Sequence, residues 1–278
     1  MPVGAPSEDE ISEILALKDK CEKRMGIAIV LGEDFLQSLD KAGVGAFAFM
    51  KERCFVGFVF FYSFEKEEAE ASVFADPDAD WNQVCSQLLE ATKRECARRG
   101  HARLLLMNDR RSTFIEKFLE DAGGGLAFSE HRMVSRMDPM ISGQHVELEE
   151  VSNEDATLQD IELECFGHFH SKPDQRRYLS MVEGEPIGKI DINTAGLEAE
   201  LTGFSVVPRL RGKGLGKSIL QDVVKKLRAE GNERITLDVQ TDNDIALSLY
   251  LRSGFEREFT IDYYAISLED MISGGHHS

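Results

Sequence analysis

The chain lacks a long apolar segment. Its longest apolar run, Cys54 to Tyr62, falls far short of the ~20 residues that a helix needs to cross a bilayer. The sequence also does not open on a basic stretch followed by an apolar one, as a secretory signal would. We therefore predict a cytoplasmic protein without a membrane partner.

Cysteine is scarce as well. The five cysteines are an odd number and form no Cys-x-x-Cys pair. Disulfide-built domains and structural zinc sites use closely spaced, paired cysteines. The pattern argues against both, so we expect reduced thiols and no metal site.

Basic residues are outnumbered. The chain has 32 Lys and Arg against 50 Asp and Glu, which gives a formal net charge of -18. This balance argues against a nucleic-acid partner, and it fits either a cationic substrate or solubility alone. The run from Leu201 to Gln221 nevertheless has no acidic residue and carries Arg209, Arg211, Lys213 and Lys217. We interpret this local positive charge as a place for phosphate.

Residues 208 to 218 form a glycine-spaced basic loop between a β-branched run and an amphipathic helix. Glycines at 212, 214 and 216 let backbone N–H groups converge on an anion, and the start of the helix adds its positive field. A Walker A loop would need a glycine where Arg211 stands. The dinucleotide fingerprint would need one at Lys217. The pattern that remains is Arg211-x-x-Gly214-x-Gly216.

The residues after this loop continue the pattern. Apolar residues recur at helical spacing up to Gly231, Ile235 to Val239 alternates like a strand, and Asn243 to Tyr250 opens a second helix. In this order, the motifs from Glu198 to Ile266 resemble the GNAT family of N-acetyltransferases.

The first half of the chain repeats the pattern of the second. Four anchors stand 131 positions apart (208 minus 77): Pro77 and Pro208, Gly100 and Gly231, Arg103 and Arg234, Gly123 and Gly254. At this offset the loop residues are replaced by acidic or bulky ones: Arg211 by Asp80, Gly212 by Trp81, Gly214 by Gln83, Gly216 by Cys85. We therefore expect a first domain without a working cofactor loop.

We predict an α/β fold class (an α+β mixed sheet) with two tandem GNAT-like acyl-CoA N-acyltransferase domains. Residues 1–140 would form the degenerate domain and residues 141–278 the domain that binds acetyl-CoA, with a linker near 138–146. This architecture resembles mycothiol synthase and related two-domain acyltransferases, which share fold more firmly than substrate.

The resemblance implies acetyl-CoA as cosubstrate and assigns a binding role to particular residues. The implied cofactor-binding residues are Phe204 and Val206 for the pantetheine arm, Arg211, Gly212, Lys213, Gly214, Leu215, Gly216 and Lys217 for the pyrophosphate, and Asn243. Asn243 could instead cap its helix, and the two roles do not exclude each other. Tyr250 stands where the family often has a tyrosine that protonates the thiolate, although a packed helix aromatic is the alternative.

An amine acceptor must lose a proton, which requires a base or a water relay. Strand alternation is expected to place Glu198, Glu200, Thr202, Phe204 and Val206 on one face. Among these, Glu200 is the preferred base. Two alternatives stay open: Glu200 is an exposed strand carboxylate without a catalytic role, or the amine attacks without a base. His168, His170 and Arg176 are candidates for acceptor contact.

These features predict direct transfer of an acetyl group from acetyl-CoA to a primary amine of a small-molecule acceptor. No activated nucleophile stands out, so no covalent enzyme intermediate is expected. A non-catalytic acyl-CoA sensor and a transferase of longer acyl chains are alternatives, and a homodimer is left open.

Overall fold

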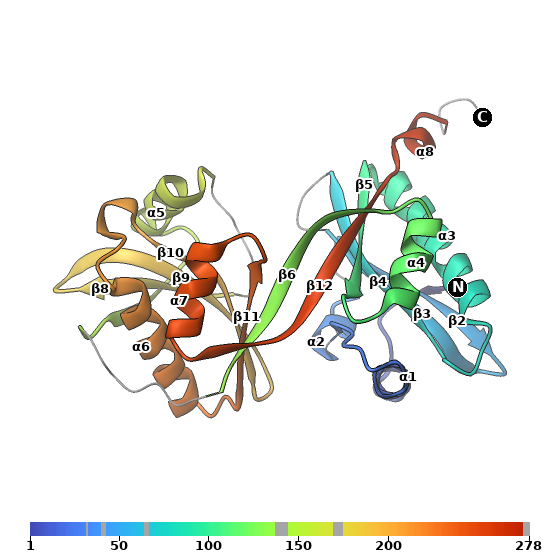
Figure 1. Ribbon diagram of the computed structural model, residues 1–278, viewed down its shortest axis with the longest axis horizontal. Coiled ribbons are helices and arrows are strands. Elements are labelled where there is room, and N and C mark those ends of the chain that lie inside the picture. Colours follow the sequence, from blue (N-terminus) through green and yellow to red (C-terminus); the bar gives the residue numbers. More distant parts are fainter. Residues whose placement is uncertain (32, 40–42, 64–66, 137–143, 169–174, 275–278) are drawn as a thin grey trace. The chain divides into compact units, whose positions relative to one another are not determined.

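The computed structural model describes residues 1–278 except 32, 40–42, 64–66, 137–143, 169–174 and 275–278 (Figure 1). The chain divides into two compact units. Unit 1 comprises Met1–Ser129 and Phe259–Ser278, and unit 2 comprises Glu130–Glu258.

This division differs from the expected boundary at residue 140 because two strands each contribute to both units. Strand β6 (Gly125–Ser135) begins in unit 1, and its second part pairs with β11 (Arg234–Gln240) of unit 2. Strand β12 (Phe255–Ser267) begins in unit 2 and ends antiparallel to β5 (Arg103–Asp109) of unit 1. The end of the chain therefore completes the sheet of the first unit. Most of the expected linker lies outside the described residues.

Unit 1 has the sheet order β1-β2-β3-β4-β5-β12, in which β4 and β5 are parallel and the other pairs antiparallel. Its further strands are β1 (Pro2–Val3), β2 (Val44–Lys51), β3 (Cys54–Tyr62) and β4 (Glu68–Ala75). Its helices are α1 (Glu8–Met25), α2 (Glu33–Leu36), α3 (Trp81–Arg99), α4 (Thr113–Asp121) and α8 (Glu269–Gly274).

Unit 2 has the sheet order β6-β11-β10-β9-β8-β7, in which β10 and β11 are parallel and the other pairs antiparallel. Its further strands are β7 (Glu147–Val151), β8 (Arg176–Val182), β9 (Glu185–Ala195) and β10 (Glu198–Val206). Its helices are α5 (Ala156–Phe166), α6 (Leu215–Ala229) and α7 (Asp244–Arg252), and a 3₁₀ turn, Pro208–Leu210, follows β10. The predicted mixed α/β class is confirmed.

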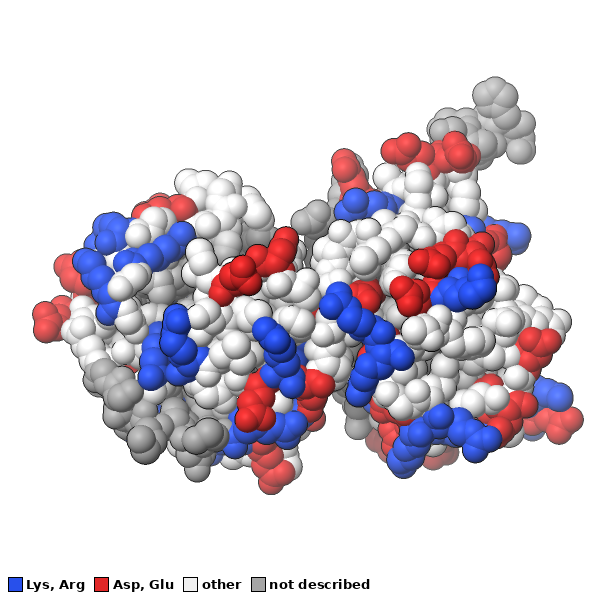
Figure 2. Space-filling view, in the orientation of Figure 1, with Lys and Arg blue, Asp and Glu red and all other residues white. Residues whose placement is uncertain are grey.

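Charged side chains are intermixed on the face shown in Figure 2. Within each unit, Lys and Arg (blue) alternate with Asp and Glu (red), and neither unit presents a broad surface of one sign on this face. On this face, the excess of acidic residues in the sequence does not gather in one patch.

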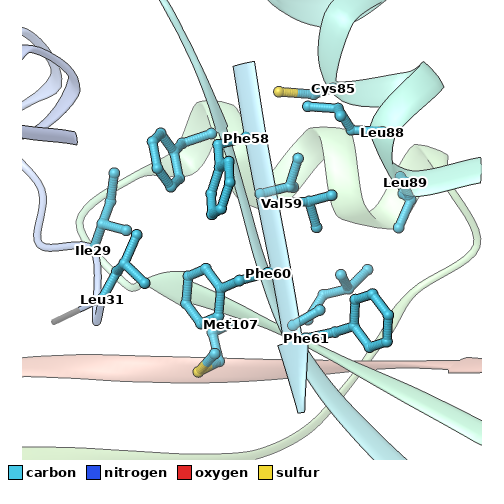
Figure 3. Packing of buried hydrophobic residues seen from close by; sticks show 14 of the residues in the cluster. Ile29, Leu31, Phe58, Val59, Phe60, Phe61, Cys85, Leu88, Leu89 and Met107 are labelled. Carbon is cyan, nitrogen blue, oxygen red and sulfur yellow. The ribbon is translucent and has the colours of Figure 1, made fainter. Parts of the chain in front are cut away.

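The core of unit 1 is built on the alternation of β3. Figure 3 shows Phe58 and Phe60 on the side of Ile29 and Leu31, and Val59 on the opposite side, toward α3. All five side chains are buried. Alternate residues of one strand thus fill the space on both faces of the sheet.

In unit 2 the two faces of the sheet have separate cores. Leu201 and Leu237 pack with α6 and α7 on one face. On the other face, Leu158 of α5 packs against Leu179 of β8. The residues of β10 and β11 that point away from α6 and α7 therefore lie on the face that α5 partly covers.

Strand β10 contains a β-bulge that changes the face of its side chains. It pairs with β9 at Thr202↔Asp191 and again at Ser205↔Lys189, so three steps along β10 oppose two along β9. An extra residue reverses the alternation that follows it. Phe204 therefore packs in the same core as Leu201, against α6 and α7. The expectation that Phe204 and Val206 share a face with Glu200 is wrong for this reason.

Candidate active site

The glycine-spaced loop ends at the N-terminus of α6. Gly214 is the N-cap residue with φ 83°, and no side chain caps this helix. Gly212 also has a positive φ of 78°, and a Cβ at either glycine would meet no atom within 4 Å. Both glycines are thus required for backbone conformation. The N–H groups of the first helical turn lack a side-chain acceptor, an arrangement that binds anions. We call residues 212–217 the cradle.

Gly216 serves a different purpose within the cradle. A Cβ there would lie 3.0 Å from Leu249 of α7 and 3.6 Å from the ring of Phe204. The absence of a side chain therefore lets α6 approach α7 and the end of β10 closely. Of the cationic residues in the cradle, Lys213 is exposed and Lys217 is partly buried.

Arg211 stabilises the start of the loop with its side chain. Its Nε donates a hydrogen bond to the carbonyl oxygen of Val206 at 3.0 Å, and the thiol of Cys165 donates to the same oxygen at 3.8 Å. The guanidinium is therefore turned back toward β10, and the Val206 carbonyl already has donors.

Strands β10 and β11 part shortly before the cradle. Their parallel pairing runs from Glu198↔Arg234 to Leu201↔Leu237, and within these fully described strands it ends there. A cavity of about 50 Å³ lies where they diverge. Its lining is formed by Leu201, Thr202, Gly203, Phe204, Leu220, Leu237, Asp238 and Tyr250. We call this cavity the notch.

Tyr250 contributes its side chain to the notch from α7. It is 8% exposed, and its ring centroid lies 6.3 Å from that of Phe204 and 6.2 Å from that of Phe255. Burial disfavours the phenolate and raises the pKa of Tyr250 to about 12. The hydroxyl therefore keeps its proton at neutral pH, and the side chain is a packed aromatic.

Glu200 lies on the opposite face of β10 from the α6 core. Its carboxylate is 3.3 Å from Nη1 of Arg132 on β6 and accepts a hydrogen bond from the Asn193 amide at 3.3 Å. It does not line the notch, although the strand that carries it does.

Asp238 is the acidic residue of the notch, and sequence reasoning missed it. Arg132 contacts it with Nε at 2.6 Å from Oδ1 and with Nη2 at 2.7 Å from Oδ2. One guanidinium therefore holds Asp238 and Glu200 in a single cluster. A carboxylate within the predicted strand Ile235 to Val239 was the available signal.

The other described candidates from the sequence do not line the notch. Asn243 caps α7, where its side-chain oxygen accepts from the N–H of Ala246 at 3.1 Å. His168 is exposed and His170 is outside the described residues. Arg176 forms an ion pair with Glu230 at 2.8 Å, after the last residue of α6. These contacts do not bring Arg176 into the lining of the notch.

In unit 1, a side-chain carboxylate caps the N-terminus of the corresponding helix, α3. Asp80 is the N-cap of α3, and its carboxylate accepts from the N–H of Gln83 at 3.1 Å. The next residue, Trp81, is buried, with its ring 4.9 Å from that of Phe114 and 5.0 Å from that of Phe118 on α4. A carboxylate and an indole thus stand where unit 2 has Arg211 and Gly212.

The described part of the chain holds neither a metal-ligand cluster nor a membrane-spanning helix. No group of three or more His, Cys, Asp or Glu side chains there is arranged to hold a metal ion. None of the helices in that part of the chain combines the length and the apolar character needed to span a membrane.

Comparison with known proteins agrees with the geometry. Residues 143–255 match the model of the acetyltransferase (GNAT) family. The structure is similar to a GCN5-related N-acetyltransferase from Sphaerobacter thermophilus (TM-score 0.78, 14% identity, 96% of this chain and 95% of that one). It is also similar to a tandem GNAT protein from the clavulanic acid biosynthesis pathway (TM-score 0.75, 12% identity, 96% and 98%).

At such identities the structural likeness shows the fold, and it extends over both units. The tandem arrangement predicted from the sequence repeat is therefore confirmed. The family match covers the cradle, the notch and Tyr250. Residues 143–255 therefore form a GNAT acetyltransferase domain, and this match supports an acyltransferase.

Proposed function

We propose that unit 2 binds acetyl-CoA and transfers its acetyl group directly to a primary amine of a small acceptor. One observation carries this proposal: the uncapped N-terminus of α6 follows the strand whose divergence opens the notch. Residues 202–217 thus contain an anion site and, a short distance along the chain, part of the lining of the notch. Tyr250 of α7 contributes a proton donor to the same cavity. In acetyl-CoA a pyrophosphate and a thioester are linked in the same way by the pantetheine arm.

The cradle would hold the pyrophosphate. The N–H groups of residues 212–216 would donate to its oxygens, and Lys213 and Lys217 would add positive charge. The N–H groups of Arg211 and Lys217 already donate to the carbonyl oxygens of Pro208 and Gly214. Phe204 would bond the arm through its backbone, whereas the Val206 carbonyl is shared with Arg211. Asn243 fixes the start of α7, which positions Tyr250 seven residues later, about two turns along the helix.

The notch would hold the reacting groups. Acetyl-CoA supplies an acyl group already activated as a thioester. Tyr250 would donate its proton to the departing sulfur, because its pKa of about 12 keeps the phenol protonated. A carboxylate is a much weaker base than an amine. Glu200 and Asp238 would therefore bind the acceptor ammonium and pass its proton to water.

Unit 1 would not bind the donor. The carboxylate of Asp80 already caps α3, and the indole of Trp81 fills the adjacent space. We infer one acetyl-CoA site per chain. The cytoplasmic location, the absence of nucleic-acid, membrane and metal partners, and a homodimer stay predictions.

A thiol-release assay tests the proposed function. The protein would be incubated with acetyl-CoA and a panel of primary amines: a polyamine, an amino sugar, an aminoglycoside and a peptide with a free N-terminus. We expect release of CoA with at least one amine, and loss of that release in Tyr250→Phe. Binding of acetyl-CoA without release for any amine would favour the sensor, and the absence of binding would refute both.

A further inference from the structure

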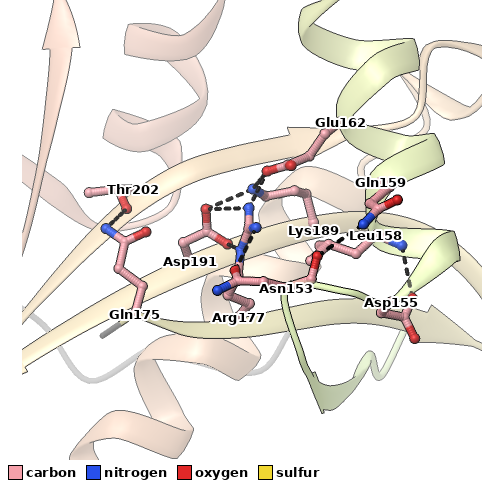
Figure 4. Close-up of polar contacts among 10 residues, drawn as sticks. All are labelled: Asn153, Asp155, Leu158, Gln159, Glu162, Gln175, Arg177, Lys189, Asp191 and Thr202. Carbon is pink, nitrogen blue, oxygen red and sulfur yellow. Dashed lines mark hydrogen bonds and ion pairs between the residues drawn. The ribbon is translucent and has the colours of Figure 1, made fainter. Parts of the chain in front are cut away.

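Four charged side chains are buried together in unit 2 (Figure 4). Arg177 of β8, Lys189 and Asp191 of β9, and Glu162 of α5 each have side chains no more than 4% exposed. Lys189 Nζ lies 2.7 Å from Asp191 and 2.5 Å from Glu162. Arg177 donates to Asp191 at 3.0 Å and also to Glu162. We call these four residues the ion network.

The ion network lies directly against the bulge of β10. Asp191 pairs with Thr202 just before the register shift, and Lys189 pairs with Ser205 just after it. Between them, Gly203 has φ +54°, and a Cβ there would lie 2.5 Å from Asp191 Oδ2 and 3.1 Å from Lys189 Nζ. Because Gly203 also lines the notch, the network contacts the backbone that forms the cavity.

Unit 1 has apolar residues at the matching positions of its strands. At the offset of 131, Arg177, Lys189 and Asp191 correspond to Ala46, Phe58 and Phe60. The strand pairing confirms the match, since Ala46↔Phe60 corresponds to Arg177↔Asp191 and Phe58↔Phe74 to Lys189↔Ser205. Figure 3 shows Ile29 and Leu31 beside these two phenylalanines, where unit 2 has Glu162 beside Lys189.

Unit 1 also lacks the bulge. Its β3 and β4 pair without a register shift from Gly57↔Ala75 to Tyr62↔Glu70. By contrast, a shift between Phe49 and Met50 recurs between Ser180 and Met181 at the same offset of 131. The two units thus keep a common irregularity elsewhere, and the bulge next to the network is specific to unit 2.

Fold stability alone does not account for buried charges at these positions. Replacing a buried ion network by well-packed apolar residues is often neutral or stabilising. Unit 1 has that replacement and adopts the same fold. A role that unit 1 does not need is therefore the better explanation, and the structure offers one in the bulge.

We propose that Glu162, Arg177, Lys189 and Asp191 are positioning residues that hold the bulge of β10 and thereby shape the notch. Two network residues, Asp191 and Lys189, pair through their backbone with β10 on either side of Gly203, at the place where β10 parts from β11. The bulge turns Phe204 toward α7, where its ring lies 6.3 Å from Tyr250. The network therefore acts mainly on the acyl group and its proton donor, and none of its four residues belongs to the cradle. This inference rests on the proposed function.

The test replaces charges without leaving any unpaired. The variant Lys189→Met/Asp191→Leu removes one cation and one anion and leaves Arg177 with Glu162, which are already bonded. A second variant removes all four charges with Arg177→Met and Glu162→Met added. The matched control is Phe58→Leu/Phe60→Leu, at the corresponding positions of unit 1.

Three quantities would be measured for each variant: the thermal midpoint of unfolding, the Kd for acetyl-CoA and the kcat for CoA release. We expect the double variant to keep the wild-type midpoint while kcat falls about 100-fold, the loss typical of a misplaced reacting group. The Kd for acetyl-CoA should rise much less than kcat falls, because the cradle keeps its contacts with the pyrophosphate. Hydrogen exchange of a peptide covering 202–206 should become faster. The control should unfold at a lower temperature and keep the wild-type kcat.

The outcomes separate the two proposals. A wild-type protein that binds no acetyl-CoA or releases no CoA with any amine would refute the proposed function itself. An active wild type together with a folded double or fourfold variant of wild-type kcat and exchange rate would refute the positioning role alone. If neither variant folds, the network is required for the fold and the inference is wrong.

Discussion

Units 1 and 2 share one fold but differ at the start of the helix that follows their central strand. In unit 1, Asp80 caps α3 with its own carboxylate and Trp81 packs on α4. In unit 2, Gly214 begins α6 with no side-chain cap. The same N-terminal dipole is thus neutralised within the chain in one unit and left for an external anion in the other. Under the proposed function, this difference separates a unit whose helix is capped by its own side chain from a unit that binds an anion.

The buried interiors of the two units also differ, with apolar side chains in unit 1 where unit 2 has charged ones. Unit 1 has phenylalanines at the positions where unit 2 has Lys189 and Asp191, and the bulge between β9 and β10 has no counterpart between β3 and β4. In each case unit 1 has the locally more stable choice, either a satisfied helix cap or an apolar core. The comparison indicates that unit 2 has given up stability at two places to form a site.

The largest effect is expected from transferring the unit 1 loop into unit 2. Arg211→Asp with Gly212→Trp would place a carboxylate and an indole in the loop just before Gly214, the N-cap of α6, so the cradle could no longer accept a pyrophosphate. We expect the affinity for acetyl-CoA to fall about 1,000-fold or more, since roughly 4 kcal/mol of phosphate contacts would be lost. Calorimetric titration measures this loss. Unchanged affinity would show that the cradle is not the donor site.

Removing the proton donor should have the next largest effect. Tyr250→Phe keeps the buried ring, so we expect an unchanged Kd for acetyl-CoA and a fall in kcat of about 100-fold. The pKa of about 12 means that the phenol loses its proton only in strongly alkaline solution. Steady-state rates of the wild type should therefore show no loss from this group between about pH 7 and pH 10. A wild-type rate for Tyr250→Phe would remove the acid role.

The two carboxylates beside Arg132 should differ. Asp238 lines the notch and Glu200 does not. We therefore expect Asp238→Asn to raise the acceptor KM about tenfold and Glu200→Gln to raise it less. Initial rates at varied acceptor concentration give both values. The reverse order would restore Glu200 as the main acceptor contact.

The smallest effect is expected from opening unit 1. Asp80→Ala removes the cap of α3 and should lower the free energy of unfolding by about 1 kcal/mol. Because Trp81 still fills the adjacent space, no second acetyl-CoA site should form. Chemical denaturation and calorimetry of the same variant test both statements. A gain of a second site would show that the Asp80 cap alone closes unit 1.

Local sequence features predicted much of the site. The glycines at 212, 214 and 216, the cap Asn243 and the replacement of the loop by Asp80 and Trp81 all act through neighbouring residues, and the structure places them as expected at helix starts. Such features are readable because a helix terminus is specified by the residues next to it.

Features that depend on strand pairing were not predicted. The bulge reversed the face of Phe204, although Gly203 in a strand was a cue for an irregularity. Asp238 joins Glu200 only through Arg132 on β6, which is distant in sequence. Arg177, Lys189 and Asp191 read as ordinary polar positions of two strands, and only their burial identifies them as a network. For the same reason, the sequence did not predict that β6 pairs with a strand of unit 2 and β12 with a strand of unit 1.

The binding stoichiometry of the wild-type protein tests the contrast between the units most directly. Isothermal titration with acetyl-CoA measures the number of sites per chain along with the affinity. We predict one site per chain, formed by the cradle of unit 2. Two sites would contradict the closure of unit 1 by Asp80 and Trp81, and no site would contradict the proposed function of unit 2.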